Sequence, residues 1–379
     1  MTPSLANLLL SHAPPCLSLY QPTHRRHPDN QQDPIRFRNL VKSLEESLQA
    51  RQPSVDVAAL MKPYHALAAD TEFWRHSHEG LAVMRAADVF EVIRLPGQVP
   101  ELAVVADTFH VKPLMRFTQS GERFQILAVD RETVRMFEGD RDVLAEIEPA
   151  PGVPRTIEEA LGEELTEPQL SVASHGGGGG SKVAMHYGSG SKADEVDSDT
   201  EKFFRAVDRA VTEHHSKPSG LPLVLAALPQ YHPVFRSLTS NAALIEEGID
   251  IHPGALSPDE FRLRAWAALE PRYQARLAQL AGQYAESLSK GQGSDDLSQV
   301  ALAALAGRVG TVFVESERHV PGKINSESGA ITLAGPDEVG GDDVIDDIAE
   351  MVLRKKGEVL VVSTDQMPTR TGIAAIYRY

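Results

Sequence analysis

The stretch DVIDDIAEMVLRKKGEVLVVSTDQMPTRTGIAAIYRY, residues 343–379, decides the fold class of this chain. Its first part, residues 343–356, has apolar side chains at helical spacing and stops at Gly357, which predicts a helix with a glycine just past its end. Strand-like apolar runs follow at 358–363 and 372–379. A helix alternating with strands predicts a layered α/β arrangement, in which helices pack on a sheet.

The residues upstream continue the same alternation. Ser257 is placed to cap a helix, Pro258 suits its first position, and Glu260 completes the capping signal. The elements predicted next are the rest of that helix, with apolar spacing as far as Leu288, a helix at 297–306, a strand at 311–315 and a short strand near Ile331. We therefore expect residues 255–379 to form an αβα sandwich.

The first third of the chain, residues 1–119, is predicted to be a compact α/β domain. It opens with a strand-like run at 16–20 that ends at Pro22. The elements predicted after it are a helix opening at Pro34, a helix at 55–69, and strands at 80–85, 89–95 and 102–106.

The middle third, residues 120–254, is predicted to be a second α/β domain. Ser198 and Glu201 form a candidate capping box for a helix with one apolar face, and Asp199 favours the same helix start. The other predicted elements are strands at 124–130, 133–138, 143–147, 170–173 and 221–228, and a helix through Phe235 and Leu244.

Length and composition favour a globular protein of several domains. At 379 residues the chain exceeds one ordinary core, and 42% apolar residues suffice for packed interiors. Cys16 is the single cysteine, which excludes an intramolecular disulfide and a cysteine metal cluster. There is no apolar run of about 18 residues and no basic signal-peptide region. We therefore expect a cytoplasmic protein without a membrane partner or a cofactor.

The charge balance limits how the chain can bind nucleic acid. Its formal net charge is −16, which argues against wholesale coating of nucleic acid, and we expect no DNA partner. Acidic residues gather at 140–167 and 337–350, whereas residues 25–51 carry six bases against four acids. Any RNA contact is therefore expected from the N-terminal segment or from a glycine-rich stretch in the middle domain.

That glycine-rich stretch is HGGGGGSK, residues 175–182. Glycine follows tight backbone paths, and its bare N–H groups can approach a partner closely. Lys182, His186 and Lys192 add positive charge suited to RNA phosphates. The alternative is a flexible surface loop, which is the default for such composition. A Walker phosphate loop is excluded, because Ser181 rather than glycine precedes Lys182.

Two further groups of residues are candidate sites. The loop after the first strand contains His24, Arg25 and Arg26, which are candidate RNA contacts or else a solvated loop. His214 and His215 are adjacent and do not share a helical face, so capping of a helix end is favoured over a metal site. No metal site is predicted.

Three segments, in order, resemble the bacterial relatives of the archaeo-eukaryotic peptide-chain release factors and Pelota. PCLSLYQPTHRRHPDNQQDPIRFRNLVKSLEESL (15–48) resembles the opening of their N-terminal domain. The glycine stretch stands where release factors hold their Gly-Gly-Gln loop. VGTVFVE (309–315) and GEVLVVSTDQMPTRTGIAAIYRY (357–379) resemble the end of their C-terminal domain, which has an L7Ae-like fold. The resemblance implies three domains, and the ribosome and tRNA as partners.

One departure from the family pattern bears on chemistry. In release factors the glutamine after two glycines helps place a water against the ester of peptidyl-tRNA. Here Ser181 follows Gly180, and the next glutamine is Gln230. Glycine N–H groups can still approach the ester, but the water-orienting side chain is missing. Loss of termination activity is therefore expected, and the candidates to replace the glutamine are His175, Ser181 and Lys182. The loop itself comprises Gly176, Gly177, Gly178, Gly179 and Gly180.

Three functions remain open from the sequence. The first is a ribosome-associated factor for release, rescue or hibernation, with the glycine loop directed at the peptidyl-transferase region. The second is an esterase or hydrolase acting on peptidyl-tRNA. The third is a protein-interaction module that reuses the fold without touching RNA. The sequence leaves the oligomeric state, the ribosomal state recognised and the physiological trigger undetermined.

Overall fold

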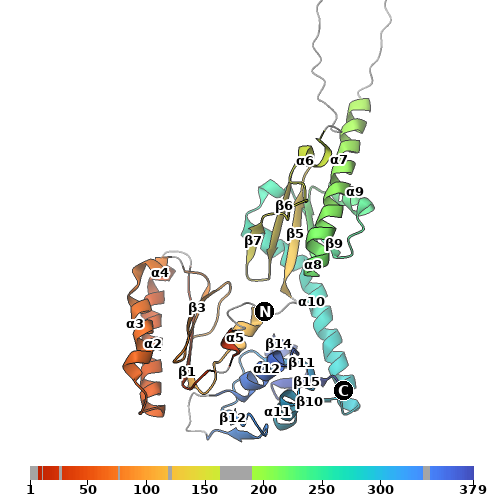
Figure 1. Cartoon of the computed structure of the whole chain (residues 1–379). Helices are drawn as coiled ribbons and strands as arrows, with labels where there is room; N and C mark the ends of the chain where they lie inside the picture. The colour runs from red at the N-terminus through yellow and green to blue at the C-terminus, as the bar shows by residue number, and fades with distance from the viewer. Residues whose placement is uncertain are drawn as a thin grey trace, which may run out of the picture. The chain divides into compact units, whose positions relative to one another are not determined.

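The computed structural model describes residues 7–10, 12–24, 28–75, 77–117, 122–162, 190–335 and 342–379, with the backbone alone at 190–195. The chain divides into two compact units (Figure 1). The first unit combines Met1–Ser120 with Gln274–Tyr379, and the second is Gly121–Tyr273. The mixed α/β class is confirmed, with several sheets flanked by helices. The division into three domains stays a prediction, as does the L7Ae-like assignment of the last third.

The N-terminal part of the first unit is an antiparallel sheet in the order β3-β2-β1-β4. Side chains of β1 alternate between two cores. Leu17 and Leu19 pack with the helices, whereas Cys16 and Tyr20 join the opposite cluster, so both faces of β1 are buried. The strands are β1 Cys16–Pro22, β2 Gly80–Arg85, β3 Phe90–Leu95 and β4 Leu102–Ala106, and the helices are η1 Asp29–Gln32, α2 Asp33–Arg51, α3 Val57–Ala69, α4 Thr71–Arg75 and α5 Lys112–Arg116.

The C-terminal part of the first unit is a mixed sheet in the order β10-β15-β11-β14, where only β11 and β14 run parallel. A separate hairpin, β12-β13, stands beside it. The strands are β10 Gly293–Ser294, β11 Val309–Glu315, β12 Gly322–Ile324, β13 Ile331–Leu333, β14 Glu358–Val362 and β15 Ile373–Tyr377, and the helices are α11 Leu297–Leu305, α12 Val344–Arg354 and η6 Thr364–Gln366.

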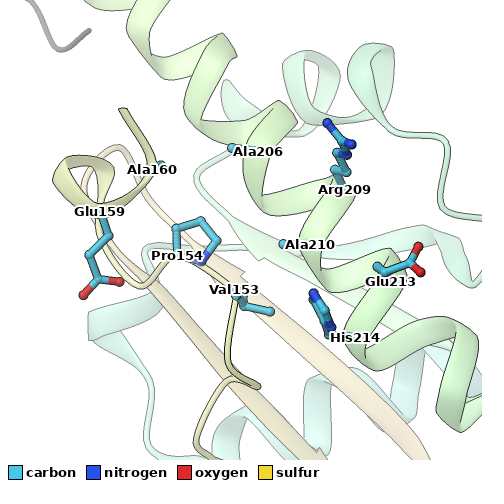
Figure 2. Close-up of a pocket in the computed structure, with 10 residues that line it drawn as sticks. Val153, Pro154, Glu159, Ala160, Ala206, Arg209, Ala210, Glu213 and His214 are labelled. Atoms are coloured by element: carbon cyan, nitrogen blue, oxygen red, sulfur yellow. The ribbon is translucent and has the colours of Figure 1, made fainter. Parts of the chain in front are cut away.

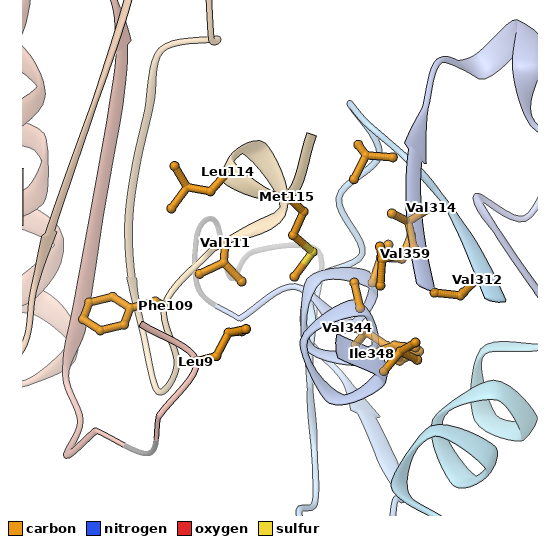
Figure 3. Close-up of a cluster of buried hydrophobic side chains, with 14 of the residues drawn as sticks. Leu9, Phe109, Val111, Leu114, Met115, Val312, Val314, Val344, Ile348 and Val359 are labelled. Carbon is orange, nitrogen blue, oxygen red and sulfur yellow. The ribbon is translucent and has the colours of Figure 1, made fainter. Parts of the chain in front are cut away.

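One hydrophobic core joins these two parts of the first unit. Phe109, Val111 and Met115, from the segment around α5, belong to the same buried cluster as Val344 and Ile348 of α12 (Figure 3). Segments more than two hundred residues apart in the sequence therefore share one interior. Because burial of apolar surface is the main favourable term in folding, the N-terminal and C-terminal parts stabilise each other.

The second unit is a five-stranded sheet in the order β7-β6-β5-β8-β9, with helices on both faces. Leu127 and Val129 of β5 face α7 and α9, whereas Ile126 and Ala128 face the start of α10. The strands are β5 Phe124–Val129, β6 Val134–Gly139, β7 Leu144–Ile147, β8 Leu223–Ala227 and β9 Leu244–Asp250, and the helices are α6 Ile157–Leu161, α7 Gly190–Val211, η4 Thr212–Ser216, α8 Lys217–Ser219, α9 Tyr231–Leu238, η5 Pro253–Ala255 and α10 Pro258–Ser289.

The predicted start of α10 is confirmed in atomic detail. The Ser257 N–H and hydroxyl both donate to the Glu260 carboxylate, at 2.9 and 2.7 Å, and the Glu260 N–H donates to Ser257 Oγ at 3.4 Å. This reciprocal cap satisfies N–H groups that a helix start leaves without partners. The helix continues past Pro271 as far as Ser289.

Two predictions for the second unit are wrong. Helix α7 begins at Gly190, so Ser198, Asp199 and Glu201 lie inside it and form no capping box. Asp199 instead pairs with Lys202 at 3.1 Å, one turn further along the helix. Leu244 begins strand β9 rather than ending a helix, because α9 stops at Leu238. The predicted strand at 170–173 lies outside the described residues.

Within the described ranges, no helix is both long enough and apolar enough to span a membrane.

Candidate functional site

The predicted glycine loop falls in a part of the chain that the structure does not describe. His175, Gly176 to Gly180, Ser181, Lys182 and His186 all lie outside the described residues, as do Arg25 and Arg26. Lys192 lies in the first turn of α7, where the backbone alone is described. The proposed roles of these residues therefore stay predictions.

The elements that flank this segment in the sequence are described, and they pack together. Helix α6 ends at Leu161 and α7 begins at Gly190. Ile157 and Ala160 of α6 contact the same buried cluster as Phe203 and Phe204 of α7. That cluster anchors both helices on one face of the sheet, so the two flanks of the loop segment rest on a single packed body.

A pocket of about 820 Å³ lies beside these two flanks, and we name it the α7 pocket. Figure 2 shows Val153, Pro154 and Glu159 on one side, with Arg209 and His214 on the other. Its apolar walls are mostly small side chains, and its polar groups are charged and exposed. The complete lining is Gly152, Val153, Pro154, Glu159, Ala160, Ala206, Arg209, Ala210, Glu213 and His214.

The charged groups of the α7 pocket are suited to binding rather than to proton transfer. Glu213 pairs with Lys217 at 3.1 Å, and that hydrogen bond lowers the pKa of the Glu213 carboxyl. Arg209 makes no ion pair within the part of the chain that the structure describes. The lining contains no serine, threonine or cysteine, and no carboxylate pairs with His214. The pocket can therefore hold a ligand, but its described side chains supply no hydroxyl or thiol nucleophile.

Gly152 closes the α7 pocket through a close backbone approach to His214. Its φ is +96°, and a Cβ there would lie 3.1 Å from His214 Nε2. We expect Gly152→Ala to lower the free energy of unfolding of the second unit by about 1 to 3 kcal/mol, because it combines backbone strain with crowding. Gly220→Ala is the matched control, since Gly220 has a φ of +64° with open space around it. Urea unfolding followed by Trp266 fluorescence measures the stability of both variants. Equal losses of stability would show that crowding against His214 does not contribute.

His215 has a structural role that the sequence did not indicate. It lies in η4, a π-helical turn that continues α7, and its Nε2 accepts the Ala150 N–H at 3.0 Å. Burial lowers the pKa of the His215 imidazole, which favours the neutral ring that can accept this bond. The prediction that both histidines cap a helix end through their charge is therefore wrong for His215.

His24 is held by the start of helix α2. Its Nδ1 lies 2.8 Å from Asp33 Oδ1, and its backbone N–H donates to Asp33 Oδ2 at 2.8 Å. Arg36 also approaches Asp33 Oδ1, at 3.2 Å. Asp33 is fully buried, so these contacts stabilise a charge that would be costly alone. The RNA contact of His24 stays a prediction.

A second polar constellation joins α12 to the loop at residues 107–112, and we name it the α12 clasp. Asp342 accepts the Asp107 N–H at 2.7 Å, and Asp347 accepts the Thr108 hydroxyl at 2.9 Å. Asp346 accepts the N–H groups of Val111 and Lys112. Four carboxylates, those of Asp342, Asp343, Asp346 and Asp347, thus hold one short loop. The sequence showed acid density at 337–350 but not this partner.

Asp343 is the centre of the α12 clasp. It is fully buried and lies 3.0 Å from the ammonium of Lys112, which is only 3% exposed. It also accepts the Val320 and Ile345 N–H groups at 3.0 and 3.1 Å, and the second of these caps α12. Burial opposes ionisation of Asp343, but the hydrogen bond with His319, the neighbouring Lys112 and the Val320 N–H hold the pKa of its carboxyl well below the usual range.

The remaining acids of α12 are shifted the opposite way. Burial and neighbouring carboxylates raise the pKa of Asp346 to about 7 and that of Asp347 to about 8. Burial likewise raises the pKa of Glu350 to about 8, although it pairs with Arg354. One oxygen from each of these three acids lies within 4.8 Å of the others. Each acid already has a hydrogen-bond or ion-pair partner in the protein, which explains the cluster as a structural clasp.

Comparison with known proteins places the middle of the chain in a family. Residues 123–308, just under half of the chain, match the bacterial archaeo-eukaryotic release factor family 3. This range contains nearly all of the second unit, including the α7 pocket and the segment with the five glycines. Among proteins of curated function, none matches this chain.

Several solved structures align with weak overall similarity. The crystal structure of the archaeal translation termination factor aRF1 is 15% identical, with 99% of this chain and 96% of that chain covered and a TM-score of 0.26. Archaeal Pelota, in a ribosome-bound model with ABCE1, is 13% identical, with coverage of 79% and 78% and a TM-score of 0.40. Dom34 of S. cerevisiae, a translation termination-like factor, is 12% identical, with coverage of 77% and 74% and a TM-score of 0.39.

These TM-scores are too low to carry a conclusion, so the assignment rests on the match at residues 123–308. That match confirms the resemblance seen in the sequence, and it does so over the part of the chain that carries the glycine segment. Over residues 123–308, this chain is therefore similar to the bacterial archaeo-eukaryotic release factor family 3.

Proposed function

We propose that this protein acts on the ribosome as a factor related to peptide-chain release factors, in release, rescue or hibernation. The observation that carries this proposal is the family match across residues 123–308, because release factors act on the ribosome. A cytoplasmic location follows from it. The second unit would direct its glycine segment at the peptidyl-transferase region, in contact with tRNA.

The build of the second unit supports a positioning role. Both flanks of the glycine segment, α6 and α7, rest on one side of the five-stranded sheet, and Phe203, Phe204 and Val207 of α7 are fully buried there. A packed scaffold of this kind can present a loop at a fixed place. The missing glutamine after Gly180 favours binding or protection over ester hydrolysis.

Co-sedimentation tests the ribosomal assignment. The full chain, at endogenous level, should appear in ribosomal fractions of growing cells, of starved cells or of both. Its absence from these fractions under both conditions would overturn the proposal. A moderate-salt wash of the ribosomes is the control. It removes proteins held by non-specific charge contacts, because such contacts weaken steeply with salt.

Replacing all five glycines of the loop, Gly176 to Gly180, with alanine should weaken ribosome binding by about tenfold, a loss of about 1.4 kcal/mol. The physical reason is that five added Cβ atoms narrow the backbone paths and block close approach of the N–H groups. Binding of the purified variant to vacant ribosomes measures the effect. Glycine-to-alanine changes at Gly282 and Gly335, which have open space around them, are the control.

The hydrolase alternative has its own test. His175→Ala, Ser181→Ala and Lys182→Ala, made together, should leave turnover of peptidyl-tRNA at the level of the unchanged chain. A clear drop would show that one of these side chains carries chemistry, and it would replace the binding role with a hydrolytic one.

A further inference from the structure

Two helices of the first unit end at the same place, beside the last strand. Arg378, just after β15, donates through Nη1 to the Gly307 carbonyl at 3.4 Å and through Nη2 to the Lys355 carbonyl at 3.1 Å. Its backbone N–H donates to the Arg308 carbonyl at 2.8 Å. The ends of α11, α12 and β15 therefore gather four basic residues, which we name the C-terminal basic surface: Arg308, Lys355, Lys356 and Arg378.

The charge of this surface is not neutralised by the protein. All four side chains are exposed, and none of them lies within ion-pair distance of an acidic side chain of the described residues. Neighbouring bases differ in this respect, because Arg354 pairs with Glu350 and Arg276 pairs with Glu358. A local excess of four cations stands out in a chain whose net charge is −16.

Helix ends explain only part of this excess. The negative end of a helix dipole favours cations in its last turn. Arg378 already serves both helices, since its guanidinium is bonded to a terminal carbonyl of each. Three more charges, those of Arg308, Lys355 and Lys356, exceed what the two helix ends require. No side-chain hydrogen bond in the described structure holds either lysine ammonium.

The backbone at Lys356 is a second, independent observation. Both helices end with a hydrogen bond of the same kind. In α11 the Arg308 N–H donates to the Ala303 carbonyl at 2.9 Å, and in α12 the Gly357 N–H donates to the Val352 carbonyl at 2.8 Å. The left-handed position of this motif is Gly307 in α11, with φ +68°, but Lys356 in α12, with φ +59°. Glycine is the residue that this position favours.

Lys356 is the single non-glycine residue with positive φ in the described ranges. A lysine there strains the backbone where glycine would relax it. We infer that its positive charge has a use that offsets this strain. No structural role for the charge is visible, because the side chain is exposed and makes no ion pair with the described residues.

Aromatic side chains complete the surface. The guanidinium carbon of Arg308 lies 5.2 Å from the centre of the Tyr377 ring. Tyr379 is 68% exposed, and its carbonyl oxygen accepts from Arg308 at 3.4 Å. Cations beside exposed aromatic rings are what single-stranded RNA recognition uses, since phosphates need the charge and unpaired bases stack on rings.

We propose that the C-terminal basic surface binds the phosphate backbone of single-stranded RNA. Arg308, Lys355 and Lys356 contact phosphates, and Tyr379 offers a face on which a base can stack. That this RNA belongs to the ribosome rests on the function proposed above. The RNA contacts predicted from the sequence lay elsewhere, in the loop at 24–26 and the glycine segment.

The main test compares two triple charge reversals in the full chain. Arg308→Glu, Lys355→Glu and Lys356→Glu together remove the proposed contacts. Arg38→Glu, Lys42→Glu and Lys62→Glu are the matched control, because they change one arginine and two lysines at exposed positions of α2 and α3. Both variants have the same net charge, so non-specific electrostatics fall equally in the two.

Binding to a labelled single-stranded RNA of about twenty nucleotides, at several salt concentrations, is the readout. The surface variant should bind at least about tenfold more weakly than the control. The slope of log affinity against log salt should fall by about 2, because each lost phosphate contact removes roughly 0.7 from it. Equal affinities and equal slopes for the two variants would overturn the proposal.

Lys356→Gly separates binding from folding. Glycine relaxes the left-handed backbone, so the thermal unfolding midpoint should not fall. RNA binding should nevertheless weaken about threefold, with a salt slope smaller by roughly 0.7. A variant that binds RNA as tightly as the unchanged chain would show that the lysine charge is not used there.

Ribosome binding by the same variants distinguishes this proposal from the function on which it builds. If the unchanged chain binds RNA through the surface but does not bind ribosomes, the proposed function fails and the surface stands. If it binds ribosomes and both triple variants bind RNA equally, the surface proposal fails alone. If the surface variant loses ribosome binding while RNA binding is unchanged, the partner is an acidic protein and the RNA proposal is overturned.

Discussion

Replacing Asp343 with alanine should lower the free energy of unfolding of the first unit by about 3 to 5 kcal/mol. The change leaves the Lys112 ammonium, 3% exposed, without its carboxylate partner. It also removes the acceptor of the Val320 and Ile345 N–H groups, one of which caps α12. An uncompensated buried charge and a lost cap act in the same direction.

The measurement uses the position of the two tryptophans. Trp74 lies in the first unit and Trp266 in the second, so a Trp266→Phe background leaves Trp74 fluorescence to follow urea unfolding of the first unit. This separation matters because two units need not unfold in one step. Lys112→Met combined with Asp343→Asn is the control, and it should recover much of the loss because both buried charges are gone. A loss below about 1 kcal/mol in Asp343→Ala would show that Lys112 finds water or another partner.

The elements of the first unit follow from local patterns in the sequence. Strands at 80–85 and 102–106 were predicted with the bounds that the structure has, because each is a short apolar run between turn residues. The start of α10 was predicted from Ser257 and Glu260 for a similar reason, since a capping box is a contact between residues three apart. Local signals of this kind act within one turn or one strand.

The wrong predictions fall where a local sequence signal was overridden by another interaction. Ser198 and Glu201 have capping spacing, yet α7 extends eight residues further toward its N-terminus. A cap sequence shows where a helix can begin, but continued hydrogen bonding of the next turn can override it. Leu244 shows the same limit, because its strand β9 is fixed by pairing with β8 across the sheet rather than by its neighbours in sequence.

The candidate sites depended on contacts that no local pattern contains. The acids of α12 were visible as charge, but their partners at residues 107–112 lie up to 239 positions away. Without that pairing, an acidic helix start is explained by the helix dipole alone. The C-terminal basic surface was missed for the same reason, because Arg308, Lys355 and Arg378 come from three separate elements. The resemblance to release factors, in contrast, was recognised from contiguous segments, and the match at residues 123–308 supports it.

Raising the pH from about 6.5 to about 8 should lower the free energy of unfolding of the first unit by roughly 4 kcal/mol. In the folded chain the pKa of Asp346 is raised to about 7, and those of Asp347 and Glu350 to about 8. In the unfolded chain these acids lose their protons near pH 4. The folded state therefore binds more protons across this range, and stability falls as the pH rises.

Three other shifted groups of the first unit act mostly outside this window. The lowered pKa of Asp343 contributes stability that is lost only as the pH falls into the acid range. Burial lowers the pKa of His110 to about 3, so above about pH 6.5 its contribution opposes the fall by only about 0.4 kcal/mol. Burial and nearby carboxylates raise the pKa of Cys16 to about 12, so its thiol stays neutral. Each extra proton in the folded state contributes a slope of about −1.4 kcal/mol per pH unit, and Asp346, Asp347 and Glu350 together hold about two such protons on average across this range.

Asp347→Asn with Glu350→Gln tests the assignment of this slope. The amides keep the size of the side chains but bind no proton, so the double variant should lose most of the pH dependence between about 6.5 and about 8. It should also be more stable than the unchanged chain at the upper end, where the carboxyls would otherwise become charged in a buried setting. Urea unfolding followed by Trp74, in the Trp266→Phe background, measures both chains at each pH. Parallel curves of stability against pH for the double variant and the unchanged chain would show that other groups titrate, because the groups common to both chains contribute equally to both curves.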